Sequence, residues 1–389
     1  MLETLKFGKG NWANKTDSTL AYSDQYGNFQ AIPFDFTRAT TATRVNKQGL
    51  IESVNDGIAR IDYSDSTQGA LLLEPQRTNL YLNSEPTSNE GAMGGVSYES
   101  FDWAIGFTNC VKFGDNSTIR YRYGASAVNA TQYAVSAFVI MDDLSEPVVS
   151  GLSSNGDFSF AIGGSLAYSV NPNIDMGNNI WKVSASIPSG GNSANNGIIK
   201  YTTQSNKGFR VVGYQLEQGS YATSYIPTSG TTVTRNQELC YDATPVINSE
   251  EGVLYAEISA LVDDAPHRWI SLSDATTNNR VNFQYYTGSN EIRVEVRSEG
   301  VTSLNSFIIV TDITDFIKIG VKWKLNDFAV WINGVEVATS NTGNAPIGMS
   351  TLSFTHYGQS ANPFFGNTKD LKIYNTALTD AQLQTLTTI

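Results

Sequence analysis

The stretch NDFAVWINGVEVATS, residues 326–340, decides the fold class. Its Asn333-Gly334 pair lies between two runs of alternating apolar residues, and this dipeptide favours the type I′ turn that joins two antiparallel strands. The preceding segment IKIGVKW, residues 317–323, also alternates and supplies a third strand. The three segments together predict an antiparallel meander.

The same period of two recurs along most of the chain from about residue 96 onward. In VLYAEISALV, residues 253–262, the side chains of Leu254, Ala256, Ile258 and Ala260 fall on one face, which is typical of a half-buried strand. Further strands are expected at STIRYRY (117–123), TQYAVSAFVI (131–140), NIWKVSASI (179–187) and FRVVGYQLE (209–217). In the third of these, Trp181 is expected to pack in a core.

The strand FRVVGYQLE leads into an exit that is rich in tyrosine, serine and threonine. Strict alternation places Val212, Tyr214 and Leu216 on one face. Gly213, on the other face, permits a close approach of the backbone. The exit SYIPT, residues 224–228, is expected to cross a sheet edge, because its proline cannot donate to a strand ladder.

Helix signals are rare. Thr379-Asp380 followed by AQLQTL predicts one capped helix, after the strand DLKIY at residues 370–374. Charged residues make up only 16% of the chain, while Gly, Ser, Thr and Asn recur throughout, which is typical of strands joined by many turns. The predicted fold is all-β, with two antiparallel β-sandwiches in tandem after an N-terminal extended region.

The chain of 389 residues is too long for one ordinary core, so two or three domains are expected. Weak alternation and two prolines in the segment 226–252 indicate a connection between sandwiches, and a second break lies near residues 79–89. The predicted parts are an N-terminal attachment or wrapping region (1–78), a first sandwich (79–235), a linker (236–247) and a second sandwich (248–389).

The formal charge is 25 − 37 = −12, and the carboxylates are scattered along the chain. Such a surface repels phosphate backbones and anionic lipid, so neither nucleic acid nor a membrane is an expected partner. The apolar runs are too short to span a bilayer, and MLETLKFGKG lacks the apolar stretch of a secretory signal. Two cysteines, Cys110 and Cys240, exclude a disulfide scaffold and a four-cysteine zinc site, and whether they pair stays open.

Long ordered matches connect residues 34–235 with one group of proteins. FDFTRATTATRVNKQGLIESVNDGIARIDY (34–63) and GALLLEPQRTNLYLNSE (69–85) resemble the leader of tailed-bacteriophage surface proteins that precedes a carbohydrate-binding-like sandwich. WKVSASI (181–187) and VVGYQLEQGSYATSYIPTSGTTVTR (211–235) resemble the end of that sandwich. The resemblance implies a protein of the virion surface.

The C-terminal block, 248–389, resembles the concanavalin-A-like lectin/glucanase superfamily in its laminin-G-like form. The resemblance lies in VKWKLNDFAVWINGVEVA (321–338) and FFGNTKDLKIYNTALTDAQLQTL (364–386). It implies that the sandwiches are jelly rolls. These segments correspond to a hairpin, a closing strand and a cap helix, and not to a sugar site.

That superfamily includes glycosidases with an E-x-D-x-E motif, and the nearest string here is EIRVEVRSE, residues 291–299. Arg293 replaces the central acid, and a cation between carboxylates lowers their pKa, whereas a glycosidase acid needs a raised pKa. The string is better explained as a solvated strand face of alternating sign, with apolar residues beneath it. No GxSxG elbow, HExxH, Walker loop or dinucleotide fingerprint occurs, so an enzyme is not expected.

Binding of neutral sugars requires aromatic faces with amide and hydroxyl groups, and sandwich loops provide both. Tyr285 and Tyr286 are adjacent on a strand, so only one of them can face outward. The candidate carbohydrate-binding residues are Trp103, Tyr121, Tyr123, His267, Trp269, Tyr285, His356 and Tyr357. No cofactor is expected, although Asp263-Asp264 or the segment 312–315 provides the oxygen ligands that suit calcium.

The leading hypothesis is a phage virion protein, displayed as a head or tail fibre or decoration, that adheres to host-surface glycans. It would bind other virion proteins through its N-terminal region and form a homo-oligomer, dimer or trimer, because weak sugar contacts gain from repetition. Two alternatives stay open. One is a glycan depolymerase with a site between domains or protomers, and the other is a purely structural spacer.

Overall fold

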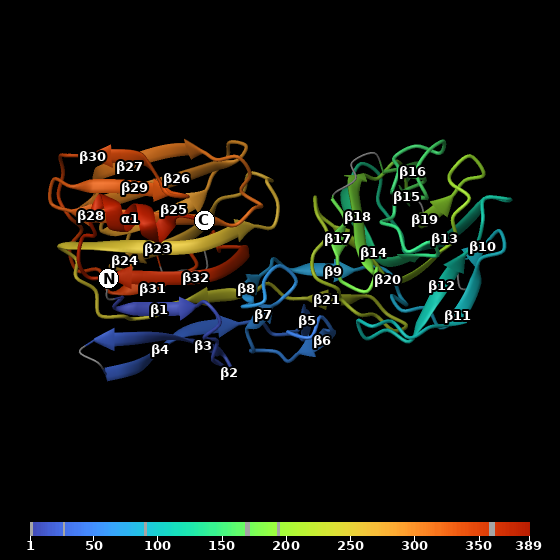
Figure 1. Ribbon diagram of the computed structural model, residues 1–389, viewed down its shortest axis with the longest axis horizontal. Helices are drawn as coiled ribbons and strands as arrows, with labels where there is room; N and C mark the ends of the chain where they lie inside the picture. The colour runs from blue at the N-terminus through green and yellow to red at the C-terminus, as the bar shows by residue number, and fades with distance from the viewer. Residues whose placement is uncertain (1–2, 26–27, 89–91, 168–171, 193–194, 358–361) are drawn as a thin grey trace. The chain divides into compact units, whose positions relative to one another are not determined.

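The computed structural model describes residues 3–25, 28–88, 92–167, 172–192, 195–357 and 362–389, with backbone alone at 23–25, 28–29 and 120–123 (Figure 1). The described residues form antiparallel sheets and one short helix. The all-β prediction with antiparallel sandwiches is therefore confirmed. Nowhere in these residues is there a helix with the length and apolar character that a membrane crossing requires.

The chain divides into two compact units, each built from separated segments. Unit 1 contains residues 1–40, 54–75 and 237–389, and unit 2 contains residues 41–53 and 76–236. These boundaries differ from the predicted ones, because residues 1–78 are divided between the units and the expected linker 236–247 contributes a strand to unit 1. Alternation shows that a segment is a strand, but not which distant strand it pairs with.

Unit 1 has two sheets among its described residues. The larger follows the order β22-β4-β3-β1-β32-β23-β28-β29-β30, with β2, β7 and β8 attached to it. Its strands are β1 (Leu5–Gly8), β2 (Asn14–Lys15), β3 (Ser18–Gln25), β4 (Asn28–Thr37), β7 (Arg60–Asp62), β8 (Ala70–Leu73), β22 (Leu239–Tyr241), β23 (Glu251–Ala260), β28 (Ile317–Lys324), β29 (Phe328–Ile332), β30 (Val335–Ser340) and β32 (Gly366–Tyr374). The smaller sheet has the order β27-β26-β25-β24-β31. Its strands are β24 (Arg268–Ser273), β25 (Arg280–Tyr285), β26 (Glu291–Ser298), β27 (Val301–Ile309) and β31 (Thr351–Ser353).

The N-terminal strands belong to the same sheet as the C-terminal ones. β1 pairs with β32, with Leu5 opposite Ile373 and Phe7 opposite Leu371. All four side chains lie in the core of unit 1. The start of the chain is therefore an integral part of this sandwich.

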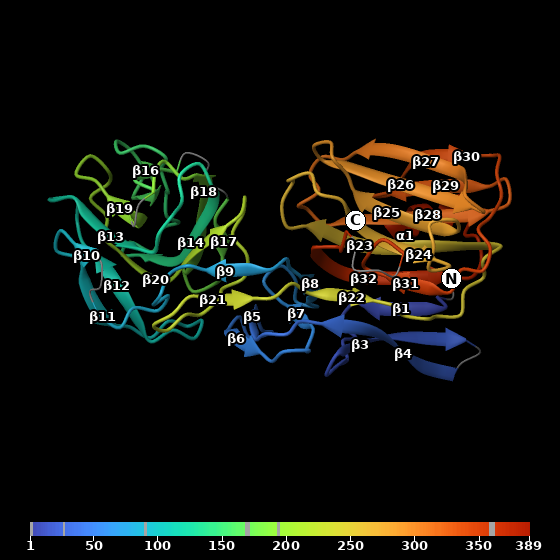
Figure 2. The same ribbon diagram turned by 180° about the vertical axis from the view of Figure 1, so that it is seen from behind.

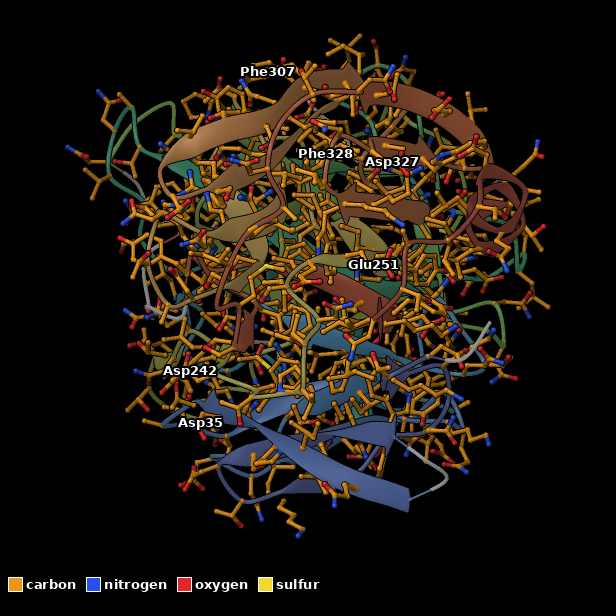
Figure 3. The ribbon with its side chains drawn as sticks, turned by 90° about the vertical axis from the view of Figure 1, so that its left-hand side faces the viewer. Asp35, Asp242, Glu251, Phe307, Asp327 and Phe328 are labelled. Carbon is orange, nitrogen blue, oxygen red and sulfur yellow. The ribbon has the colours of Figure 1, made fainter. Side chains whose placement is uncertain are left out.

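The two sheets of unit 1 bury their apolar faces against each other. Leu254, Ala256, Ile258 and Ala260 of β23 all lie in this core, which confirms their predicted common face. The opposite face of the larger sheet is covered by helix α1 (Asp380–Thr387), whose Leu383 is buried (Figure 1). Figure 3 shows the strands of this unit with their side chains.

Two local predictions for unit 1 are confirmed. Asn333 and Gly334 both have positive φ, 49° and 82°, as a type I′ turn requires, and they join β29 to β30. Thr379 caps α1 in a capping box with Gln382.

A buried ionic cluster lies in unit 1 close to the points where the chain passes between the units. The carboxylate of Glu238 accepts hydrogen bonds from Arg38 Nη1 at 2.7 Å and Arg60 Nε at 2.8 Å, and Arg60 Nη2 also reaches Glu74 at 2.8 Å. The four side chains are at most 4% exposed. The cluster thus joins three segments that are far apart in the sequence.

Unit 2 also contains two larger sheets in its described part. One has the order β10-β13-β19-β15-β16, and the other β11-β12-β20-β14-β18-β17. These strands are β10 (Ala92–Met93), β11 (Ser97–Ser100), β12 (Asn109–Phe113), β13 (Arg120–Gly124), β14 (Gln132–Met141), β15 (Ser159–Ile162), β16 (Ser165–Leu166), β17 (Ile174–Asp175), β18 (Trp181–Pro188), β19 (Asn196–Lys200) and β20 (Phe209–Gln218). Two small pairs accompany them, visible in Figure 2, formed by β9 (Arg77–Asn79) with β21 (Val233–Arg235) and by β5 (Ala42–Val45) with β6 (Ile51–Val54). Trp181 is partly buried against the core of this unit.

Strand β20 departs from the predicted alternation at Gly213. Its pairing with β14 shifts between Ser136 and Phe138, so the strand contains a bulge. Tyr214 and Leu216 lie in one apolar cluster, whereas Val212 lies in another. The predicted common face of these three residues is therefore wrong, because the extra residue reverses the alternation.

The predicted role of Gly213 itself is supported by the geometry. Its φ is +68°, and a Cβ added there would lie 2.5 Å from the ring of Phe138. The close approach is made by an aromatic side chain of the neighbouring strand. Cys110 and Cys240 are both buried free thiols, and burial raises the pKa of Cys110 to about 12.

Candidate functional site

Buried polar side chains gather on the outward face of the smaller sheet of unit 1, here called the polar face. Ile292, Val294 and Val296 of β26 point into the core, so the residues between them point outward. Strand register then aligns outward residues in rows across the sheet. The first row consists of Trp269, Gln284, Arg293 and Phe307. The second row consists of Ser353, Ser271, Asn282, Glu295 and Asn305. The third row consists of Thr351, Ser273, Arg280 and Arg297.

Aromatic rings gather at both ends of the first row. At one end the ring of His356 lies 3.8 Å from that of Trp269 and 4.2 Å from that of Tyr357. At the other end the centre of the Tyr286 ring lies 4.7 Å from that of the His267 ring and 5.2 Å from that of the Phe307 ring. Phe307 is half exposed and lies near the top of unit 1 in Figure 3.

Three guanidinium groups share one carboxylate on this face. Arg280 Nη2 lies 2.6 Å from the carboxylate of Glu295, Arg293 Nη2 lies 3.3 Å from it, and Arg297 Nε lies 3.9 Å from it. The guanidinium of Arg293 also lies over the rings of Tyr286, at 5.7 Å, and Phe307, at 5.5 Å. We call Arg280, Arg293, Arg297 and Glu295 the arginine cluster.

Several buried polar atoms of the polar face have no hydrogen-bond partner among the described residues. The amide of Asn282, which is fully buried, lacks a partner at both its nitrogen and its oxygen. The others are Gln284 Nε2, Trp269 Nε1, Thr355 Oγ1 and His356 Nε2. Each such group costs about 1–3 kcal/mol unless water or a ligand satisfies it. Their concentration here makes the polar face the candidate binding surface of unit 1.

The imidazole of His356 is uncharged near neutral pH. Burial, and next the positive charge of Arg280, lower its pKa from 6.5 to about 4, although Glu295 acts in the opposite direction. A neutral imidazole offers one donor and one acceptor, which suits a ligand hydroxyl.

The structure brings together half of the residues proposed from the sequence. His267, Trp269, His356 and Tyr357 all lie at the polar face, although Trp269 is only 5% exposed. Tyr285 points into the core of unit 1, and its neighbour Tyr286 is the tyrosine that faces outward.

The other proposed residues, Trp103, Tyr121 and Tyr123, belong to unit 2. Trp103 is 1% exposed and packs in an apolar cluster. Tyr121 and Tyr123 belong to β13, but their side chains lie outside the part of the chain that the structure describes.

Sequence reasoning missed Asn282, Gln284 and Arg280, which complete the polar face. Each alternates with the core residues of β25, and only the register with β24 and β26 shows that they adjoin the aromatic rings. The string EIRVEVRSE does place apolar residues in the core, as expected. Its outer face is less solvated than predicted, because Glu295 is only 3% exposed.

The aspartates considered for calcium have local roles. Asp263 accepts from Ser289 and from the backbone of Asn290, and Asp264 pairs with Arg268. Asp312 accepts from the backbone and hydroxyl of Thr314. Among the described residues, no group of three or more His, Cys, Asp or Glu side chains could hold a metal ion. Calcium binding stays a prediction.

Two further features of the structure concern carboxylates. In unit 1, burial and then the charge of Asp35 raise the pKa of Asp242, and the two side chains lie near each other in Figure 3. In unit 2, a cavity of about 160 Å³ is lined in part by Glu52, Glu85 and Tyr225.

The two carboxylates of this cavity already have partners. Glu52 pairs with Arg44 at 2.7 Å, and Glu85 accepts from the backbone of Thr108 at 2.9 Å and of Asn109 at 3.1 Å. The cavity therefore offers a ligand fewer unsatisfied groups than the polar face does.

No protein-family model and no curated protein sequence matches this chain. Among solved structures, the chain is similar to the CBM40 module of the Ruminococcus gnavus IT-sialidase, with 16% identity over 36% of this chain and 85% of that one, at a TM-score of 0.31. Domain 4 of AbnA, a GH43 extracellular arabinanase from Geobacillus stearothermophilus, gives 16% identity over 39% and 73%, at a TM-score of 0.32. Domains LG4-5 of the mouse laminin alpha1 chain give 8% over 78% and 93%, at 0.26. The first of these structures is a carbohydrate-binding module, the second a domain of an arabinanase and the third a pair of laminin domains.

Proposed function

We propose that this chain is an adhesion protein that binds glycans through the polar face. The observation that carries the proposal is the row Trp269, Gln284, Arg293 and Phe307, which lies beside the unpartnered amide of Asn282. Saccharides present apolar ring faces together with hydroxyl groups that donate and accept. Aromatic rings next to unsatisfied amides complement both properties.

The polar face is better suited to contact than to bond cleavage. Its buried carboxylate, Glu295, is engaged by three guanidinium groups. A glycosidase needs a carboxyl group that reaches the glycosidic oxygen, whereas this carboxylate is directed at arginine side chains. We therefore propose that the chain is not an enzyme.

The resemblance of residues 34–235 to tailed-phage proteins supports the wider proposal that the chain is displayed on a virion as a head or tail fibre or decoration. It would there associate with other virion proteins and with a host-surface glycan. The edge strands β27 and β30 leave Val301, Ile309 and Val335 exposed, and exposed apolar edges favour pairing with a second copy. A homo-oligomer would add the avidity that weak sugar contacts need.

A glycan array and a polysaccharide retention assay test the adhesion proposal. We expect retention of bacterial surface glycans, no new reducing ends, and at least about tenfold weaker binding by Trp269→Ala or His356→Ala. Tyr98→Ala serves as the control, because Tyr98 is an exposed aromatic residue of unit 2. Equal binding by all variants, or an array without hits, would exclude adhesion through the polar face and favour the spacer.

Asp242 favours hydrolysis as the second candidate function. A carboxyl group with a raised pKa is what a general acid needs, and Asp35 beside it supplies a second carboxylate. New reducing ends that disappear in Asp242→Asn would establish the hydrolase and contradict the proposal that the chain is not an enzyme.

A further inference from the structure

The arginine cluster of the polar face is cationic in an acidic protein. The arginine cluster carries three guanidinium groups and one carboxylate, a net charge of 3 − 1 = +2, whereas the whole chain carries −12. A neutral ligand does not need such a reversal of sign. An anionic ligand is attracted by it.

The three arginines are not equally engaged. Arg280 is 5% exposed, and it bonds to Glu295 at 2.6 and 3.2 Å and to the carbonyl of Thr277 at 2.6 Å. Arg293 and Arg297 are farther from Glu295, at 3.3 and 3.9 Å, and their side chains are 20% and 27% exposed. Arg280 therefore neutralises Glu295, and the other two guanidinium groups keep N–H donors that a ligand can reach.

Arg293 is also held in a defined orientation. Its Nε donates to Asn305 Oδ1 at 2.8 Å, and its guanidinium lies over the rings of Tyr286 and Phe307. A guanidinium fixed in this way presents paired N–H groups that match an oxyanion. A sugar bound there would extend along the first row toward the unpartnered Nε2 of Gln284.

We infer that the saccharide bound by the polar face is anionic, with a carboxylate or phosphate group on Arg293. This inference rests on the glycan-binding function proposed above. Arg297 lies four residues farther along β26, but its Nε and the Nη2 of Arg293 lie 3.9 and 3.3 Å from the same oxygen of Glu295, so the two guanidinium groups are close together. The two guanidinium groups can therefore act on the same oxyanion.

Three polymers test the inference and separate its two oxyanions. Polygalacturonate carries a carboxylate on each sugar, its fully methyl-esterified form has the same backbone without charge, and polyglycerol-phosphate teichoic acid carries phosphate. We expect at least one anionic polymer to bind about tenfold or more tightly than the ester, and its binding to weaken as NaCl rises from about 0.05 M to about 0.5 M. The anionic polymer that binds shows whether the preferred oxyanion is a carboxylate or a phosphate.

Substitution of Arg293 tests whether this residue causes the preference for anionic polymers. Arg293→Gln should weaken binding of the anionic polymer by about tenfold or more, and by a larger factor than it weakens binding of the ester, while Arg293→Lys should recover part of the loss. Arg44→Gln is the matched control, because Arg44 is also an ion-paired surface arginine, with a side chain 26% exposed, in unit 2. It should leave binding unchanged.

Two results would overturn the inference. The first leaves the proposed glycan-binding function standing, and the second overturns that function as well. If the ester binds as tightly as both anionic polymers and Trp269→Ala still weakens it, glycan binding stands and the preference for anions is wrong. If none of the three polymers and no arrayed glycan binds, both the inference and the proposed function are wrong.

Discussion

Glu238 is a fully buried carboxylate of unit 1. Its carboxylate bonds to Arg38 and Arg60, and all three side chains have no exposed area. Glu238→Gln removes the charge that compensates two buried guanidinium groups, so we expect a loss of about 3–5 kcal/mol in the free energy of unfolding. Urea unfolding followed by tryptophan fluorescence measures it.

The matched control for this prediction is Glu52→Gln. Glu52 pairs with Arg44 on the surface of unit 2, with side chains 38% and 26% exposed. Exposed pairs contribute about 0–1 kcal/mol, so this variant should change stability little. Similar losses in the two variants would contradict a structural role for the buried cluster.

His356 gives unit 1 a pH-dependent contribution to stability. Its pKa is about 4 in the folded protein and 6.5 ordinarily, because burial and then Arg280 disfavour the cation. Between these values the unfolded chain binds the proton first, so the contribution is complete above pH 6.5 and is lost as the pH falls toward 4. We expect His356→Gln to flatten the fall of Tm over this range, and Tm curves of variant and wild type that remain parallel would refute the assignment.

Substitution of Asn282 is expected to weaken glycan binding strongly but to change the free energy of unfolding little. Its amide is fully buried and has no partner among the described residues, so Asn282→Ala removes an unsatisfied group and should cost less than about 1 kcal/mol while weakening glycan binding at least tenfold. Asn79 is the control, because its equally buried amide donates to Tyr214 O and Ile226 O. Asn79→Ala should lower the unfolding free energy by about 1–3 kcal/mol and leave binding intact. A reversed pattern in urea unfolding and binding titrations would contradict the role given to Asn282.

Among the elements, strand β20 shows how one glycine changes a strand. Gly213→Ala introduces a Cβ at φ +68° and 2.5 Å from Phe138, so we expect a loss of more than about 1–2 kcal/mol. Gly164→Ala is the control, because Gly164 has a similar φ of +83° but no atom within 4 Å of its added Cβ. A larger loss of Tm for Gly213→Ala isolates the steric effect, and equal losses would show that the close approach to Phe138 is unimportant.

Local signals in the sequence were sufficient for several elements. Asn333-Gly334 predicted its hairpin and Thr379-Asp380 predicted α1, because turns and caps depend on adjacent residues. Alternation placed the residues of β23 on the correct face. It did not locate the bulge at Gly213, because a bulge depends on the partner strand as well.

At the scale of the whole molecule, the sequence predicted the fold class but not the division into units. The pairing of β1 with β32 joins residues more than 350 positions apart, and no local pattern specifies such a pairing. Prediction of the candidate site from the sequence was limited for the same reason, because the site depends on pairing between distant strands. Trp269 and His356 were identifiable as aromatic residues, whereas the amides and arginines beside them were brought there by strand register.

The central claim is that the polar face of unit 1 is the glycan-contact surface. A crystal structure of the full chain with its best-binding oligosaccharide tests this claim most directly. The account predicts sugar oxygens within hydrogen-bonding distance of Asn282 Nδ2 or Gln284 Nε2, with a sugar ring against the aromatic groups of the first row. Sugar bound instead in the unit 2 cavity lined by Glu52 and Glu85, or beside Asp242, would contradict it.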